Sequence, residues 1–188
     1  MNNKYILLRH GETRYQAEKL DTLYPADNKL NLPITKKGEK MIERISKEIK
    51  GIDLIYSSDF YRTKKSAEII AKKNGLNIIF DRRLGDTNVG IFHGKREKEY
   101  KEYFSSEKEM FAKPVPGGES WNEVRMRVTE VIKELEKNYK DKIILIVSHA
   151  DPIWLMMGYL KKLSDDELLN QKNPQGVWPN VGQYFEIK

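Results

Sequence analysis

The run Ile143–Val147 reads Ile-Ile-Leu-Ile-Val, five apolar residues with no polar residue between them. A strand of this kind has both faces covered, which is typical of a parallel sheet between two layers of helices. Shorter apolar runs at Tyr5–Leu8, Leu54–Tyr56 and Ile78–Phe80 predict further buried strands, and Tyr184–Ile187 predicts a final strand at an edge. The chain therefore carries the strands of an α/β fold.

Helical patterns fill the segments between these runs. Thr35 can cap a helix that has apolar residues on one face. A second helix is expected after Ser58-Asp59, running to the stop signal Asn74-Gly75. Ser120–Glu123 has the form of a capping box in front of a longer amphipathic segment.

Two more helices are expected in the C-terminal part. Pro152 suits the first helical position after Asp151, and Ser164 can cap a short helix. Strands and helices alternate along the chain, and 188 residues fit one compact domain, residues 1–188. The predicted fold class is α/β, a three-layer α/β/α sandwich around a mostly parallel, doubly wound sheet.

Composition excludes several classes of function. The chain has no cysteine, which rules out disulfides, thiolate catalysis and cysteine-based metal sites. The formal net charge of +6 is carried by lysines scattered along predicted helices, which favours solvated helix faces over a nucleic-acid partner. No apolar run approaches the ~20 residues of a membrane span, and the N-terminus lacks the core of a secretory signal. We therefore expect a cytoplasmic protein with no membrane partner.

Polar side chains directly follow three of the predicted strands. The first strand ends in Arg9-His10, the second runs into Ser57-Ser58-Asp59 and then Arg62, and the fourth ends in Ser148-His149. In a doubly wound sheet such strand ends converge on one crevice. Two histidines and two arginines there would form an anion site, to which the following helix adds backbone N–H donors.

Single positions in this set also have structural interpretations. His149 can be a core histidine bonded to a backbone carbonyl, and Arg62 can pair with Glu68 or Asp59 on the surface. Glu119 either belongs to the pocket or is a favourable carboxylate near a helix N-terminus. At single positions both interpretations stay open.

Four segments, taken in order, resemble the motifs of the histidine phosphatase superfamily, which includes phosphoglycerate mutases and many small-molecule phosphatases. These are Leu8–Thr13, Tyr56–Asp59 with Arg62, Pro116–Ser120 and Val147–His149. Within this superfamily, the chain resembles the small phosphatase branch. The resemblance implies a phosphatase that needs neither a metal nor another cofactor. Its implied substrates are phosphorylated small molecules.

The resemblance also implies a role for each matched residue. His10 would attack phosphorus and form a phosphohistidine that water then hydrolyses. Arg9, Arg62 and His149 would bind the phosphoryl oxygens and stabilise their charge in the transition state. Thr13 is a further candidate for a hydrogen bond to the phosphate.

The proton donor for the leaving alcohol is expected in the loop Arg83–Gly94. In the family it is usually a glutamate ahead of a Gly-x-x-x-Gly element, and Asp86 falls at that position with a side chain shorter by one methylene. Asp86 is therefore the predicted general acid, and His93 and Asp151 are the other candidates.

Contacts to the rest of the substrate are expected from less patterned segments. Gln16 stands where many family members have asparagine, and Gln16 and Glu119 are the predicted substrate-binding residues. The irregular segment Gln16–Pro33 and the segment Arg96–Pro116 are expected to contact the leaving group.

Hydrolysis of small phosphomonoesters is the leading hypothesis from the sequence. The alternative is a mutase, although mutases of this family are usually longer and carry an extra central segment. A phosphoprotein phosphatase also stays open, as does a low-turnover regulator that binds phospho-ligands, because Asp86 replaces the usual glutamate. The oligomeric state stays open too, with a homodimer through helices or the strand near Tyr184 as one arrangement.

Overall fold

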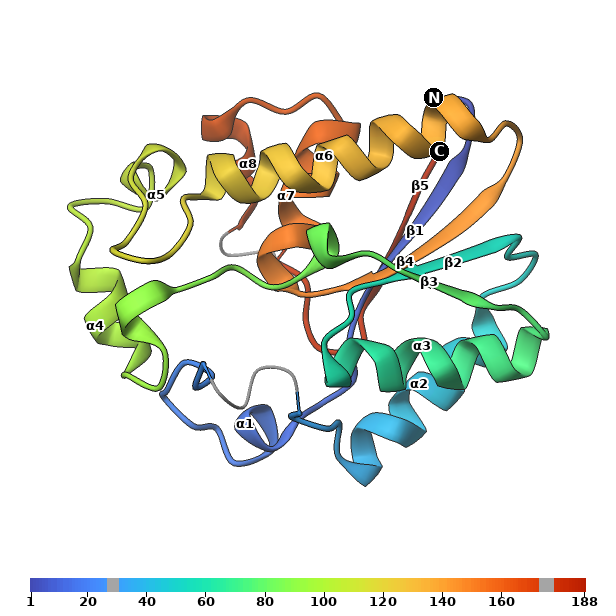
Figure 1. Cartoon of the computed structure of the whole chain (residues 1–188), viewed down its shortest axis with the longest axis horizontal. Helices are drawn as coiled ribbons and strands as arrows, with labels where there is room; N and C mark the ends of the chain where they lie inside the picture. The colour runs from blue at the N-terminus through green and yellow to red at the C-terminus, as the bar shows by residue number, and fades with distance from the viewer. Residues whose placement is uncertain (27–30, 173–177) are drawn as a thin grey trace.

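A five-stranded sheet forms the centre of the molecule in the computed structural model, which describes residues 1–26, 31–172 and 178–188. The strands are β1 (Lys4–Arg9), β2 (Leu54–Ser57), β3 (Ile78–Phe80), β4 (Ile143–Ser148) and β5 (Tyr184–Ile187). Their order across the sheet is β3-β2-β4-β1-β5 (Figure 1). The first four pair in parallel, and β5 pairs with β1 in the antiparallel direction at an edge. The predicted strands and the mostly parallel sheet are thereby confirmed.

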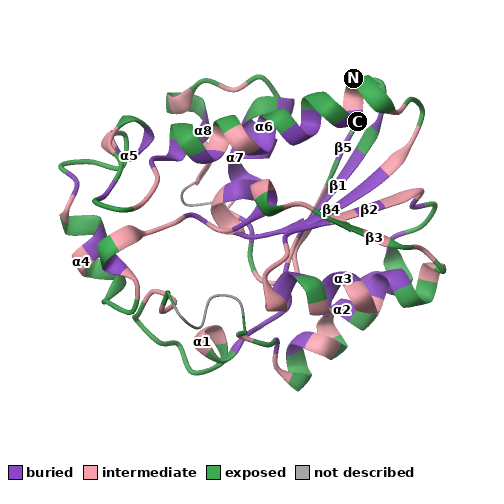
Figure 2. Cartoon of the chain, in the orientation of Figure 1, coloured by how far each residue is buried: buried purple, intermediate pink, exposed green. Residues whose placement is uncertain are grey.

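Helices cover both faces of this sheet and complete three layers (Figure 1). The four long ones are α2 (Lys36–Glu48), α3 (Tyr61–Asn74), α6 (Trp121–Asn138) and α7 (Ala150–Leu160). Along β1, Ile6 and Leu8 pack with residues of α2 and α3, whereas Tyr5 and Leu7 pack with residues of α6 and α7. Buried residues accordingly gather on the strands and on the inner sides of the helices (Figure 2). The predicted α/β/α architecture is confirmed.

The predicted helix caps form through side-chain hydrogen bonds. The Thr35 hydroxyl accepts from the Gly38 N–H at 3.0 Å. The Ser120 hydroxyl accepts from the Glu123 N–H at 3.3 Å, and the Glu123 carboxylate accepts from the Ser120 N–H at 2.7 Å. Ser164 caps α8 (Asp165–Lys172) in the same reciprocal way. These polar residues fix where three helices begin.

α7 begins just past Ser148-His149, as the sequence predicts, but Pro152 is not its first helical residue. The helix begins at Ala150 with His149 as its N-cap residue, so Pro152 takes the third helical position. The N–H groups of a first helical turn have no acceptor inside the helix, so a proline is tolerated at the third position as well as at the first. His149 thus lies at the junction of β4 and α7.

Short elements interrupt the segments that were expected to be irregular. They are α1 (Arg14–Ala17), α4 (Glu97–Glu102), α5 (Glu109–Ala112) and the 3₁₀ turns Arg82–Leu84 and Gly90–Phe92. Each has between three and six residues, too few for a helical period to show in the sequence. Within the expected loop Gln16–Pro33, residues 27–30 lie outside the described residues.

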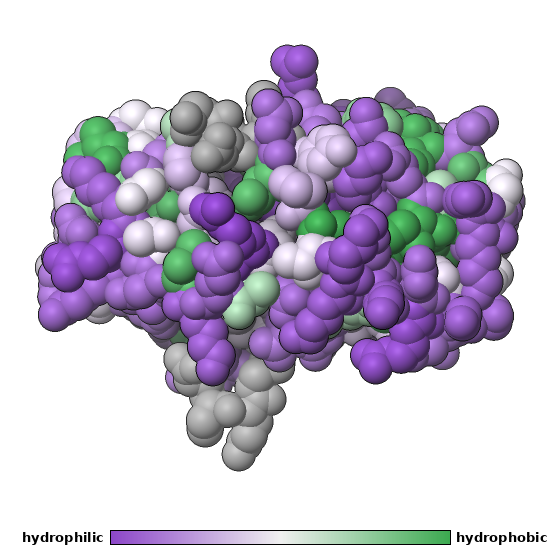
Figure 3. All heavy atoms as spheres, turned by 90° about the horizontal axis from the view of Figure 1, so that it is seen from below, coloured by the Kyte–Doolittle hydropathy of each residue, from purple (hydrophilic) through white to green (hydrophobic). Residues whose placement is uncertain are grey.

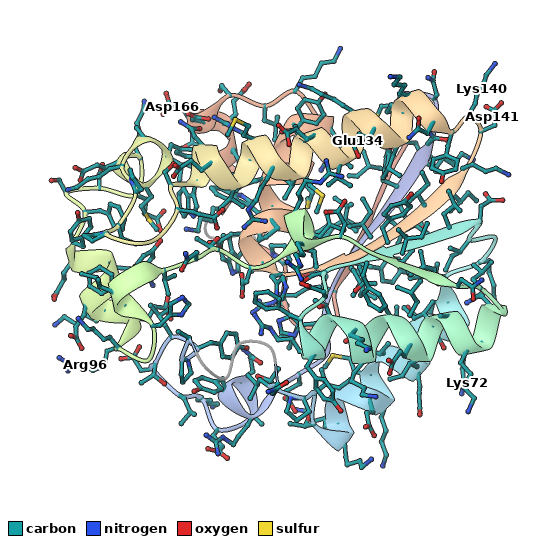
Figure 4. The ribbon with its side chains drawn as sticks, in the orientation of Figure 1. Lys72, Arg96, Glu134, Lys140, Asp141 and Asp166 are labelled. Atoms are coloured by element: carbon teal, nitrogen blue, oxygen red, sulfur yellow. The ribbon has the colours of Figure 1, made fainter. Side chains whose placement is uncertain are left out.

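Charged side chains of both signs cover the surface. Seen from below, the side of α2 and α3 is largely hydrophilic, in agreement with the solvated helix faces that the lysine pattern predicts (Figure 3). Throughout the described ranges, no helix is both long and apolar enough to span a membrane. Lys72, Arg96, Lys140, Asp141 and Asp166 are labelled examples that point outward, whereas Glu134 of α6 pairs with Arg83 at 2.7 Å (Figure 4).

Candidate active site

The C-terminal ends of β2, β4 and β1 lie side by side and bring the predicted residues together. Two backbone hydrogen bonds join these ends, from the His10 N–H to the Ser148 carbonyl (3.1 Å) and from the Ser58 N–H to the Val147 carbonyl (3.0 Å). The ring centroids of His10 and His149 are 5.4 Å apart. Both rings are buried, so the strand ends present two imidazoles to one enclosed site.

The His10 ring is held in one orientation and one tautomer. Its Nδ1 lies 2.8 Å from the Gly11 carbonyl oxygen, which can only accept, so Nδ1 carries the hydrogen. Its Nε2 is buried and has no hydrogen-bond partner among the described residues. Burial lowers the pKa of His10 well below its ordinary value, and the positive charges of Arg62 and Arg9 lower it further. His10 is therefore neutral and keeps a free lone pair on Nε2.

The loop after His10 is fixed by close backbone packing against α2. The Gly11 N–H donates to the Ser66 hydroxyl at 3.0 Å. A Cβ at Gly38 would lie 2.5 Å from the Glu12 carbonyl oxygen, so only glycine allows this approach. The Glu12 carboxylate is bound in turn by Lys37 at 2.8 Å. The loop thus holds the Gly11 carbonyl where it orients the imidazole.

Two arginines reach the site, Arg9 from the end of β1 and Arg62 from the first turn of α3. The Arg9 Nη1 donates to the Pro179 carbonyl at 2.7 Å, while its Nε is buried with no partner among the described residues. Arg62 is fully buried, and its guanidinium carbon lies 4.4 Å from the ring centroid of Tyr24 and 5.0 Å from that of Phe60. Such contacts hold a planar cation in place for a bidentate bond to an oxyanion. Nothing in the sequence singled out Tyr24 or Phe60 for this task.

His149 faces the same site from the N-terminus of α7. Its Nε2 lies 3.1 Å from the Ser58 hydroxyl, and its buried Nδ1 lies 3.5 Å from Oδ2 of Asp86. Burial lowers the pKa of His149 well below its ordinary value, and the charges of Arg62 and Arg9 add to the shift. The ring is therefore neutral, and its approach to Asp86 is not a salt bridge. The hydrogen-bond partner of the ring is thus the Ser58 hydroxyl and not a backbone carbonyl, which the core interpretation expected.

Asp86 forms an ion pair with the buried arginine. Its Oδ2 accepts from Nη2 of Arg62 at 2.7 Å, and its Oδ1 accepts from the Thr87 N–H at 3.1 Å. Arg62 therefore pairs with Asp86, and neither Asp59 nor Glu68 is its recorded partner. The predicted acid and a predicted phosphate ligand are in direct contact.

Arg127 of α6 holds the loop that carries Asp86, a role the sequence did not suggest. It donates to the backbone carbonyls of Arg83 (2.6 Å), Gly85 (2.8 Å) and Asp86 (3.0 Å). It also forms an ion pair with Glu119 at 2.8 Å, and Glu119 accepts from a backbone N–H of the same loop. Glu119, predicted as a substrate contact, is thus engaged within the protein and is not part of the cavity wall.

Thr13 and Gln16 are joined to each other beside the pocket. The Thr13 hydroxyl donates to Oε1 of Gln16 at 2.7 Å and lies 3.1 Å from the Tyr24 hydroxyl. Nε2 of Gln16 donates to the Tyr24 hydroxyl at 2.8 Å. Gln16 lines the cavity, whereas the Thr13 hydroxyl already has its donor bond within the protein. The nearby His93 uses both ring nitrogens to hold the Tyr24 carbonyl and the Asn88 side chain.

A cavity of about 830 Å³ opens above this pocket. Its wall includes Asp151, whose Oδ2 accepts from the Thr87 hydroxyl at 2.7 Å and from Nε1 of Trp121 at 3.3 Å. Burial raises the pKa of Asp151, and the negative charge of Asp86 raises it further. Asp151 therefore keeps its proton more readily than an exposed carboxyl group.

Three tryptophans form a cluster, of which Trp121 and Trp178 line the cavity. The Trp121 and Trp154 ring centroids are 4.8 Å apart, and those of Trp154 and Trp178 are 5.6 Å apart. The Lys172 ammonium lies 4.6 to 5.4 Å from all three ring centroids and 2.9 Å from Glu107. In the part of the chain that the structure describes, no group of three or more histidine, cysteine or acidic side chains is arranged to hold a metal ion.

The geometry defines a class of protein, an α/β protein with a cationic pocket built around a neutral, oriented histidine. A model of the histidine phosphatase superfamily (branch 1) matches residues 5–178. This chain therefore belongs to the histidine phosphatase superfamily.

Several known proteins are similar to this chain. A protein of Escherichia coli named as a probable phosphoglycerate mutase, GpmB, is 33% identical over 155 residues, which cover 77% of this chain and 68% of the relative. A mycobacterial glucosyl-3-phosphoglycerate phosphatase superposes with a TM-score of 0.80 at 21% identity, covering 97% of this chain and 88% of the other. An alpha-ribazole phosphatase of Shigella flexneri gives 0.76 at 18% identity, covering 97% and 89%. At such identities the two structures show the shared fold.

Proposed function

We propose that this protein is a phosphatase that hydrolyses small-molecule phosphomonoesters through a phosphohistidine on His10. The observation that carries the proposal is the His10 ring itself. Its Nε2 is buried and unpartnered among the described residues, and its Nδ1 is fixed by the Gly11 carbonyl. A neutral imidazole with a free lone pair, near enough to Arg9 and Arg62 for their charges to act on it, is a nucleophile for phosphorus.

In the first half-reaction, Nε2 of His10 forms a bond to phosphorus as the bond from phosphorus to the leaving oxygen breaks. Arg9 and Arg62 offer fixed positive charge to the phosphoryl oxygens, and His149 offers a ring nitrogen from the opposite side. The leaving oxygen takes a proton from a carboxyl group as its alcohol departs. In the second half-reaction, water attacks the phosphohistidine, gives its proton to that carboxylate and releases orthophosphate.

Asp86 is our candidate for that carboxyl group. In the structure it is bound to Arg62, and an incoming phosphate dianion competes for the same guanidinium. Once phosphate takes Arg62, the Asp86 carboxyl group is released from its ion pair and can turn to the leaving oxygen. Substrate binding therefore prepares the acid.

The test is to detect the covalent intermediate. Wild type and His10→Ala are mixed with excess p-nitrophenyl phosphate in the presence of EDTA, quenched in alkali and analysed for phosphohistidine by mass spectrometry. We expect a phosphorylated His10 peptide and steady turnover in the wild type. In His10→Ala the amount of phosphorylated peptide and the turnover rate should each fall by about 10³-fold or more. The near-UV circular dichroism spectrum of the variant should be unchanged, which shows that the fold is kept. Turnover within a few-fold of wild type in His10→Ala contradicts the proposal.

A mutase is the second candidate, because the relative from Escherichia coli carries that name. A mutase returns the phosphoryl group from histidine to a second hydroxyl of the same substrate, so orthophosphate does not accumulate. Phosphorus NMR of the wild type with 3-phosphoglycerate separates the two activities. A new phosphoglycerate signal without orthophosphate supports a mutase, whereas orthophosphate alone supports hydrolysis.

A further inference from the structure

The cavity is much larger than the phosphate pocket at its base. At about 830 Å³ it falls within the range of pockets that enclose a drug-sized ligand. Arg9 and Arg62 lie at the base, beside the two histidines. The rest of the wall is left for the group to which the phosphate is attached.

Carboxylates of the cavity wall pair with several of its cations. Among the described lining residues, five side chains are cationic, and one of them, Arg62, is bound by Asp86 at 2.7 Å. Beyond the base, Lys101 is bound by Glu97 at 2.6 Å, and Lys172 is bound by Glu107 at 2.9 Å. Lys19 is exposed, and Asp21 lines the same part of the wall. A second phosphate or a carboxylate on the substrate would have to take Lys101 or Lys172 from its carboxylate partner, or bind the exposed Lys19.

Of these two lysines, Lys172 would bind a second anionic group of the substrate more strongly, because it is less exposed to water. Its side chain is only 13% exposed, whereas that of Lys101 is 60% exposed. An exposed lysine is screened by water and contributes little to binding. The Lys172 ammonium already contacts Glu107 and three indole rings, which together surround it with favourable partners. It is therefore a poor site for a second anion.

Aromatic rings and the Asp151 carboxyl group also line the cavity. The rings are those of Tyr24, Tyr100, Trp121 and Trp178, against which a flat or chair-shaped ring can pack. Oδ2 of Asp151 accepts from the Trp121 indole N–H at 3.3 Å. A carboxyl group that retains its proton can both donate to a substrate hydroxyl and accept from one.

We propose that the leaving group of the natural substrate is an uncharged ring that carries hydroxyl groups, as in a nucleoside monophosphate or a sugar monophosphate. The wall disfavours bisphosphates and phosphorylated carboxylic acids. This inference rests on the proposed phosphatase function and adds a substrate class to it.

The experiment compares kcat/KM of the wild type on four esters, with p-nitrophenyl phosphate as the reference. Adenosine 5′-monophosphate and glucose 6-phosphate represent uncharged rings, and fructose 1,6-bisphosphate and 3-phosphoglycerate carry a second anion. We expect at least one ring ester to exceed both anionic esters by about tenfold or more. Which ring ester is favoured distinguishes a nucleoside from a sugar.

Glu107→Gln tests the charge argument directly. Without that carboxylate Lys172 is free to bind an anion, so kcat/KM for the anionic esters should rise about fivefold or more relative to the ring esters. Glu102→Gln is the matched control, because Glu102 pairs with Lys98 at 3.5 Å and does not line this cavity. Glu102→Gln should leave the ratio of kcat/KM for the anionic esters to kcat/KM for the ring esters unchanged.

The outcomes separate the two proposals. No hydrolysis of any ester, including p-nitrophenyl phosphate, contradicts the phosphatase function. Hydrolysis of p-nitrophenyl phosphate with anionic esters equal to or better than the ring esters overturns the substrate class alone. An unchanged ratio in Glu107→Gln overturns the role assigned to Lys172.

Discussion

Asp86 and Asp151 are two carboxyl groups of one cavity that differ in their surroundings. Asp86 is bound to the buried guanidinium of Arg62 at 2.7 Å. Asp151 is bound by an indole N–H and by the Thr87 hydroxyl, and burial raises its pKa. Thr87 connects them, because its backbone N–H donates to Asp86 and its hydroxyl to Asp151. Both carboxyl groups line the cavity that receives the substrate. Substitution of each in turn can show which one gives its proton to the leaving oxygen.

Asp86→Asn should slow the hydrolysis of alkyl phosphates about 10²-fold or more beyond its effect on p-nitrophenyl phosphate. A nitrophenolate leaves without a proton, so it does not need the acid. Asp151→Asn should affect both classes of substrate to the same extent, because it changes the cavity wall and not the proton donor. Rates are compared as kcat/KM over a leaving-group series. A selective loss on alkyl phosphates in Asp151→Asn, and not in Asp86→Asn, would assign the acid to Asp151.

At the scale of elements, the first turn of α2 acts as a support for the catalytic loop. Gly38 packs directly against the backbone of Glu12, and Gly11 packs against the Gly38 carbonyl. The Thr35 N–H donates to the Glu12 carbonyl at 2.7 Å, which fixes the same contact. The position of the carbonyl that orients His10 therefore depends on a helix that contributes no catalytic group.

Gly38→Ala should destabilise the protein and lower its activity, although alanine is the better helix former by about 1 kcal/mol. The added Cβ would lie 2.5 Å from the Glu12 carbonyl oxygen, and the loop must move to admit it. We expect a loss of about 1–3 kcal/mol in the free energy of urea unfolding and a lower kcat. Lys40→Ala, an exposed change in the same helix, is the control and should leave both unchanged. A Gly38→Ala protein as stable and active as wild type would show that the contact is not critical.

At the scale of the whole molecule, the order of the strands determines which residues meet. β2, β4 and β1 are neighbours in the middle of the sheet, so side chains that are far apart in sequence share one crevice. The sequence predicted this for Arg9, His10 and His149, because each lies within two residues of the end of an apolar run. Arg62 was placed there by its motif, although it lies in the first turn of α3.

Other parts of the site depend on tertiary contacts that no local pattern encodes. Arg127 sits on α6 and binds carbonyls more than forty residues earlier in the chain. Tyr24 lies in a segment without periodicity, yet its ring covers Arg62. Glu119 has the sequence context of a pocket residue, and the position of Arg127 decides that it bonds within the protein. Strand ends and caps are therefore readable from the sequence, whereas the residues that brace the site are not.

The two buried histidines make the stability of the whole molecule depend on pH. The pKa values of His10 and His149 are lowered well below the ordinary 6.5, so below that pH the unfolded chain binds protons that the folded protein does not. The two histidines make their full contribution to the free energy of unfolding above about pH 6.5. This contribution is lost as the pH falls toward the folded-state pKa values. Asp151 has a raised pKa, so its contribution has the opposite sign and is lost as pH rises above 3.8.

Urea unfolding at pH 7.5 and pH 5.5 checks this dependence. Each histidine should remove up to about 1.4 kcal/mol of unfolding free energy per pH unit below 6.5. His10→Asn cannot take up that proton in the unfolded state, so its stability should fall less steeply over the same interval. Equal slopes for wild type and His10→Asn would mean that His10 titrates alike in the folded and unfolded chain.

The tryptophan cluster has a practical consequence. Trp121, Trp154 and Trp178 are all the tryptophans of the sequence, and they lie in one group around the Lys172 ammonium. Trp121 and Trp178 also line the cavity. Indole fluorescence of this protein therefore originates at a single place beside the bound molecule. A ligand that packs there should change the emission of the native chain, so occupancy can be followed without attaching a dye.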